Sequence, residues 1–165
     1  MKKTISIVLL ILVFFIIYFI QSNFFTWFTI AGIEPNLFVI FVLFIGLFAG
    51  KKLGLILGII FGFYIDVIMG RQIGISGIML GVVGLLGEYL DKSFSKESRL
   101  TIMLMMAGST IIYEVGCYIF NIITLGVSVE IISFIKILLI EVLYNLIIAI
   151  IIYPLIQKMG HALEE

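Results

Sequence analysis

Long apolar stretches separated by short polar segments constrain this chain more than any other feature. Six of them run over approximately residues 5–23, 37–50, 53–69, 73–90, 100–125 and 131–156. Hydrophobic residues make up 63% of the 165 residues and charged residues 12%, whereas a soluble domain has about 25% charged residues. A chain this short cannot bury so much apolar surface in its own core. The sequence therefore predicts an all-α integral membrane protein, a single transmembrane domain built as a six-helix bundle.

The first apolar stretch begins like a secretory signal, because it follows Lys2 and Lys3. A cleavage site with two small residues is missing after it, so we expect it to be retained as the first helix.

Basic residues indicate the orientation of the six predicted spans. Of the ten Lys and Arg residues, all but Arg71 and Lys136 fall on the side of the N-terminus when the spans alternate. The positive-inside rule places that side in the cytoplasm. We therefore expect a multi-pass protein of the bacterial cytoplasmic (inner) membrane with both termini cytoplasmic. The aromatic residues near Trp27 would then lie at the interface between this membrane and the water on its outer side.

Composition also excludes several classes of function. Ten basic residues balance ten acidic ones, so there is no positive excess to bind nucleic acid. One cysteine, Cys117, cannot form an internal disulfide, and one histidine cannot build a His/Cys metal cluster. No nucleotide-binding glycine loop or zinc-protease motif occurs. We therefore expect no catalytic residue, no metal and no cofactor.

Glycines recur every three or four residues in the third and fourth apolar stretches. Gly54, Gly58 and Gly62 share one helix face, and Gly74, Gly77 and Gly81 continue the pattern. Such faces allow close approach of helix backbones in membranes. Two compatible interpretations follow: internal packing of the second to fourth helices, or a groove for the transmembrane helix of a partner.

Carboxylates within the spans are costly to place in lipid, so each needs a partner or water. Asp66 lies one turn before Arg71 and could pair with Arg71 or Lys136. Glu114 and Glu141 lie near mid-depth and could share a proton.

Three roles remain open for Glu114 and Glu141. They could be structural, hydrogen-bonded to neighbours such as Asn145; they could line a substrate or proton path; or they could activate water. The structural role is favoured, because no nucleophile or His base accompanies them.

Several motifs occur in the order and spacing of one known family. They are Pro35-Asn36 before the second stretch, the glycine run ending at Asp66, Glu114 in the fifth stretch, and Glu141–Asn145 followed by Tyr153-Pro154 in the sixth. In these respects, and over nearly its whole length, the chain resembles the family of the rod shape-determining protein MreD.

The resemblance implies a non-enzymatic membrane subunit of the bacterial cell-elongation machinery, which organises cell-wall synthesis. Its implied partners are an MreC-like bitopic membrane protein and, indirectly, MreB filaments and the enzymes of lateral peptidoglycan synthesis. A homodimer is compatible with the sequence.

The resemblance also implies a six-helix architecture like that of the substrate-binding subunits of ECF-type transporters. The alternative function is therefore a membrane subunit for uptake of a vitamin or micronutrient. Such a subunit needs an outward pocket with several polar groups, and the predicted outer loops contain few of them: Glu34, Arg71, Gln72, Ser128 and Glu130.

Overall fold

The computed structural model describes residues 2–25, 27–70, 72–93, 99–126 and 130–164. Six helices make up most of this part of the chain: α1 Lys2–Asn23, α2 Leu37–Ala49, α3 Lys51–Ile68, α4 Ile75–Ser93, α5 Arg99–Leu125 and α6 Ile131–Glu164. The described residues contain no strand, only one isolated bridge between Ile30 and Ile33. The predicted all-helical, six-helix architecture is confirmed.

The helices differ strongly in length. Within the described residues, two segments are long and apolar enough to cross a membrane, Arg99–Leu125 and Ile131–Pro154. In contrast, α2 has 13 residues and is about 20 Å long at 1.5 Å per residue. A hydrocarbon core is about 30 Å thick, so α2 is about 10 Å shorter than that thickness.

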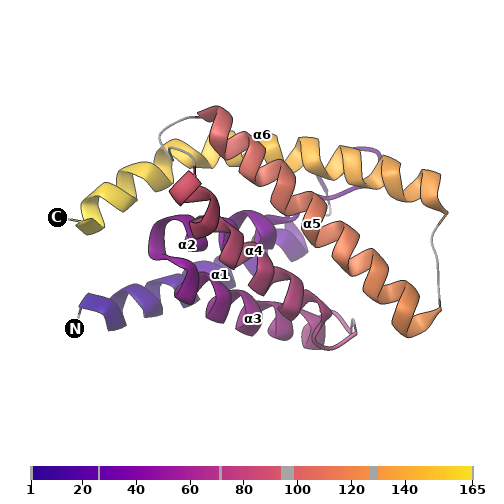
Figure 1. Cartoon of the computed structure of the whole chain (residues 1–165), viewed down its shortest axis with the longest axis horizontal. Helices are drawn as coiled ribbons and strands as arrows, with labels where there is room; N and C mark the ends of the chain where they lie inside the picture. The colour runs from indigo at the N-terminus through magenta and orange to yellow at the C-terminus, as the bar shows by residue number, and fades with distance from the viewer. Residues whose placement is uncertain (1, 26, 71, 94–98, 127–129, 165) are drawn as a thin grey trace.

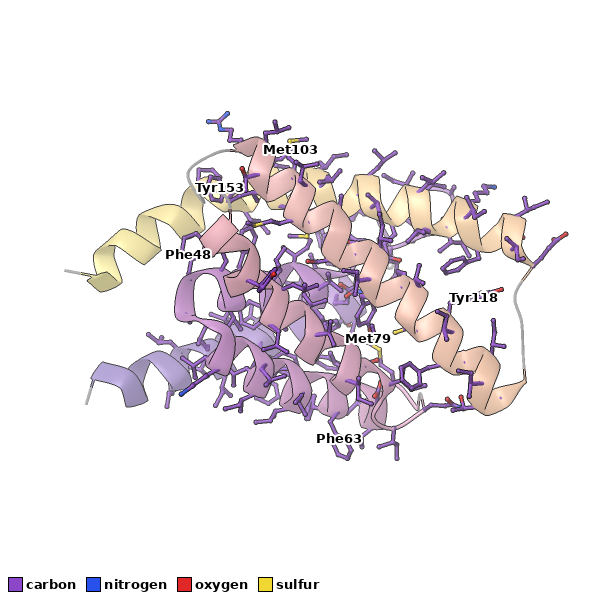
Figure 2. All side chains as sticks on the ribbon, in the orientation of Figure 1. Phe48, Phe63, Met79, Met103, Tyr118 and Tyr153 are labelled. Carbon is purple, nitrogen blue, oxygen red and sulfur yellow. The ribbon has the colours of Figure 1, made fainter. Side chains whose placement is uncertain are left out.

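The two ends of the bundle are distinct in Figure 1. Both chain termini and the turn between α2 and α3 lie at the left, whereas the turn between α3 and α4 lies toward the opposite end. The α2–α3 turn consists of Gly50 alone, with φ of 91°, a conformation that suits glycine. Figure 2 shows Tyr153 of α6 at the same end of the molecule as Phe48 of α2.

The core is centred on α2. Ten of its 13 residues are buried, as expected for a helix that is apolar on all sides. On the periphery, α1 buries Phe14, whose ring stacks on that of Phe61 with centroids 4.0 Å apart. The helices α5 and α6 continue past the start of α2, toward the right in Figure 1.

Candidate functional site: a polar junction at the start of α2

The start of α2 is held by a cluster of buried polar side chains. Asn36 is its N-cap, and the Asn36 Oδ1 atom accepts a hydrogen bond from the Val39 amide at 3.3 Å. Such a cap satisfies one of the four free amides at a helix start. The Asn36 amide in turn donates to Oδ1 of Asn145 at 2.8 Å. This bond joins α2 directly to the middle of α6.

Gln21 of α1 holds the same segment from the other side. Its Oε1 atom accepts from the Leu37 amide at 3.0 Å, and its Nε2 atom donates to the Pro35 carbonyl at 2.8 Å. One amide side chain therefore satisfies a donor and an acceptor of the chain entering α2.

Asn145 extends the cluster to α5. Its Nδ2 atom donates to Oγ1 of Thr110 at 3.1 Å, and the Thr110 hydroxyl donates to the Met106 carbonyl at 2.9 Å. Both Asn145 and Thr110 are fully buried. Residues from α1, α2, α5 and α6 thus meet in one junction, which we call the polar junction: Gln21, Asn36, Thr110 and Asn145.

The polar junction satisfies the backbone amides at the start of α2. A helix that starts part-way through a membrane exposes amides where water is absent, and each unsatisfied group costs several kcal/mol. Here the amides of Asn36, Leu37 and Val39 all have side-chain acceptors. The junction therefore supplies the hydrogen bonds that these buried amides need without water.

A second polar contact closes the turn between α3 and α4. Asp66 is 1% exposed, and its Oδ2 atom accepts from the amides of Gly74 and Ser76 at 2.8 and 3.0 Å. A carboxylate at a helix start also interacts favourably with the helix dipole. Asp66 therefore caps α4 from the end of α3, and the Tyr113 hydroxyl of α5 donates to Oγ of Ser76 at 3.3 Å.

This contact differs from the two partners predicted for Asp66. Arg71 lies outside the described residues. Lys136 is exposed on α6, and the Asp66 carboxylate bonds to the start of α4 instead. The sequence pattern did not indicate this cap, because Asp66 lies at the end of α3 and the amides that it accepts from lie at the start of the next helix, α4.

The two mid-depth glutamates have different environments. Glu141 is buried and belongs to a stripe on α6 in which every fourth residue is buried: Glu141, Asn145, Ala149 and Tyr153. Glu114 is only partly buried on α5, and Pro154 is exposed although it lies within α6.

The glycine face of α3 lies directly against α4. A Cβ atom at Gly54 would lie 2.7 Å from the Gly84 carbonyl oxygen, and one at Gly58 would lie 2.5 Å from that of Leu80. A Cβ atom at Gly62 would lie 2.5 Å from the Gly77 Cα atom. Real Cβ atoms essentially never come so close to another atom. The helix α4 therefore already covers the glycine face that the sequence suggested as a possible partner groove.

The glycines of α4 divide into two groups. Gly77 and Gly81 face α3, with a Cβ atom 3.2 Å from the Ile59 carbonyl oxygen at Gly77 and 2.8 Å from the Ile59 side chain at Gly81. Gly74 does not share this face: it has φ of 101° and open space around it. A glycine is required at position 74, because the positive φ of this turn directs the Gly74 amide to Asp66.

Sequence reasoning missed several members of these sites. Gly84 packs on Gly54, and Gly87 packs on the backbone at Leu47; both continue the small-residue spacing and could have been found. Gln21 and Thr110 could have been noticed only as isolated polar residues in apolar stretches, a weaker signal.

Comparison with known proteins identifies the family. A family model described as rod shape-determining protein MreD matches residues 1–161 of the 165-residue chain. The chain belongs to the MreD family. The predicted family is thereby confirmed, and with it a role in determining rod shape and the character of a membrane protein. No curated protein and no solved structure shows a significant match, so the likeness of the MreD chain to ECF-type transporter subunits stays a prediction.

Proposed function

We propose that this MreD chain is a non-enzymatic, multi-pass scaffold of the cell-elongation machinery in the bacterial cytoplasmic membrane. In this role one six-helix domain, with both termini cytoplasmic, binds an MreC-like bitopic protein. Through that protein it is linked to MreB filaments and to the enzymes of lateral peptidoglycan synthesis. The observation that supports a role in rod shape is the match to the MreD family over residues 1–161.

The use of the interior polar groups supports scaffolding over transport. In many transporters, broken helices point their free N-terminal amides at the substrate. Here Gln21 and Asn145 already occupy the amides at the start of α2, and Asp66 occupies those of α4. Groups that could recognise a vitamin are thus used to hold the fold, which leaves the outer surfaces of the helices for function.

The packing of the glycines narrows the choice of partner surface. Since α4 covers the face of Gly54, Gly58 and Gly62, a partner helix has to bind elsewhere. Gly108, on the partly exposed side of α5, has no atom within 4 Å of an added Cβ. It offers a smooth site in the part of the molecule that the α3–α4 contact leaves free.

A pair of glycine variants tests the scaffold. Gly58→Leu should reduce the amount of folded protein and with it all partner binding. Gly108→Leu is the matched variant, because it adds the same side chain where there is space. It should accumulate normally, and loss of co-purification with the bitopic partner would locate the contact on α5. If the wild-type protein retains no bitopic partner in mild detergent but retains a vitamin, the scaffold proposal is wrong and the transport alternative is right.

Cysteine labelling tests the proposed orientation. In a Cys117→Ala background, Glu130→Cys should react with an impermeant thiol reagent in intact cells, whereas Lys52→Cys should react only after lysis. Both positions are exposed, so burial does not interfere. The reverse pattern would overturn the assignment of the termini to the cytoplasm.

A further inference from the structure

The loop between α1 and α2 lies beside the middle of α6, not at its end. The Tyr144 hydroxyl donates to the Phe28 carbonyl at 2.5 Å, and the rings of Phe25 and Tyr144 are 6.1 Å apart. The next residue of α6, Asn145, bonds the Asn36 amide. At 1.5 Å per residue, about 21 Å of helix separate Asn145 from the start of α6. Figure 1 shows the purple loop crossing α6 short of its right-hand end.

The part of α6 beyond this loop is largely apolar and has one exposed charged residue, Lys136. Ile131 and Ile132 are 66% and 75% exposed at its start, and the apolar segment runs from Ile131 to Pro154. Two adjacent isoleucines this exposed on a long apolar helix favour lipid over water as their surroundings, so we expect lipid around the start of α6. A loop about 20 Å further along the same helix then lies deep inside the bilayer.

The backbone of the loop is suited to such a place, because it satisfies most of its own amides. The amides of Phe24 and Phe25 donate to the Ile20 carbonyl at 2.8 and 3.3 Å. Those of Trp27 and Phe28 donate at 3.2 Å to carbonyls three residues earlier.

A tight turn completes the loop. Ile30 and Ile33 exchange two 3.0 Å bonds around Ala31 and Gly32, which have φ of 54° and 79°. Irregular backbone is tolerated at membrane depth when its polar groups are satisfied within the protein.

The surface of the loop is apolar and aromatic. Residues 24–33 contain no charged side chain. Trp27 is 87% exposed, and the ring of Phe24 stacks on that of Phe28 at 4.6 Å. Together with Asn23, these three aromatic residues line a hollow. The exposed apolar sides of α1 and α6 flank the loop. Lipid that surrounds these two helices therefore also contacts the loop.

We propose that Phe24, Trp27 and Phe28 form a binding surface for acyl chains of outer-leaflet lipids, immersed near the middle of the bilayer at the level of Tyr144. This differs from the interfacial position expected from the sequence. The proposal rests on the proposed multi-pass arrangement. It concerns lipid only and does not depend on which protein the chain scaffolds.

Tryptophan fluorescence measures this depth, because Trp27 is the only tryptophan. The full-length protein is reconstituted in phosphatidylcholine vesicles brominated near the top, in the middle or near the end of the acyl chains. We expect the largest loss of Trp27 fluorescence with bromine in the lower half of the chains, and little loss with aqueous acrylamide.

Two variants in a Trp27→Phe background provide reference depths at two positions along α6. Leu143→Trp and Ile132→Trp are both at exposed positions, one beside Tyr144 and one near the start of the helix. Trp27 should match Leu143→Trp in its quenching profile and lie deeper than Ile132→Trp. A profile matching Ile132→Trp, or strong quenching by acrylamide, would overturn the proposal. Protection from every bromolipid would also overturn it, because another protein surface would then cover the loop.

The scaffold proposal fails in a different way. Its loss would show as absent co-purification with a bitopic protein, while the quenching profile stays unchanged. Incorrect orientation would show in the labelling of Glu130→Cys and Lys52→Cys.

Discussion

The α2–α3–α4 unit and the α5–α6 pair are held together by different forces. Between α3 and α4, glycines bring the helix backbones into direct contact, as at Gly58 and Leu80. In contrast, α6 is buried along one stripe, and Asn145 in that stripe bonds to α2 and α5. The first region depends on shape, and the second on a few polar bonds.

The lipid environment explains why both glycine packing and polar hydrogen bonds are needed. Apolar side chains gain little from leaving lipid for a protein interior, so helices associate through close packing or hydrogen bonds. Where glycines allow contact, packing is sufficient. Between α5 and α6, larger side chains meet, as where the rings of Tyr118 and Phe134 stack with centroids 4.2 Å apart, and Asn145 adds hydrogen bonds to the start of α2 and to α5. A mutation should therefore be severe for a different reason in each region.

The largest effect is expected from Gly58→Leu. Its Cβ atom would lie 2.5 Å from the Leu80 carbonyl oxygen, and backbone cannot move aside as a flexible side chain can. We expect a loss of about 3 kcal/mol or more, measured as reduced membrane accumulation and a lower Tm in detergent. Gly108→Leu should change neither, and an equal loss in both variants would contradict the packing contrast.

A smaller but clear loss is expected from Asn145→Leu. This change leaves the Asn36 amide and the Thr110 hydroxyl without the partners seen in the structure. Stranding buried polar groups costs about 1–3 kcal/mol. The control is Ile147→Ala, at an exposed position two residues away. Equal Tm values for these two variants would show that the polar junction does not stabilise α6.

The cap of α4 should contribute less than the junction. Asp66→Ala removes the acceptor for the Gly74 and Ser76 amides and should cost about 0.5–2 kcal/mol. Asp66→Asn retains an acceptor oxygen and should recover much of the loss. Hydrogen exchange of the first turn of α4 provides the measurement, and faster exchange is expected in Asp66→Ala alone. Unchanged exchange in both variants would exclude a capping role.

The smallest effects are expected from Glu114→Gln and Glu141→Gln. Glutamine has the shape of glutamate and retains an acceptor oxygen, so a structural role should survive the change. Protein level, partner binding and rod shape of complemented cells should all remain near those of the wild type. Loss of rod shape with normal folding and assembly would show that a titratable proton matters, and would favour transport.

Several features could be predicted from the sequence because they depend on neighbouring residues. The lengths of the apolar stretches predicted helices and lipid, and the motifs predicted the family. The spacing of Gly54, Gly58 and Gly62 predicted a smooth helix face, since residues four apart lie on one side of a helix. Such a pattern shows that a face exists but does not say which helix covers it.

The tertiary structure decided the rest. Asn36 and Asn145 are 109 positions apart, and nothing local to either residue indicates that they meet. Asp66 bonds to α4 because the turn at Gly74 brings those amides back to the end of α3. The α1–α2 loop lies beside Tyr144 in the middle of α6, a contact between residues more than 100 positions apart. Helix periodicity is a local property written in the sequence, whereas the pairing of buried donors with acceptors depends on how all six helices pack together.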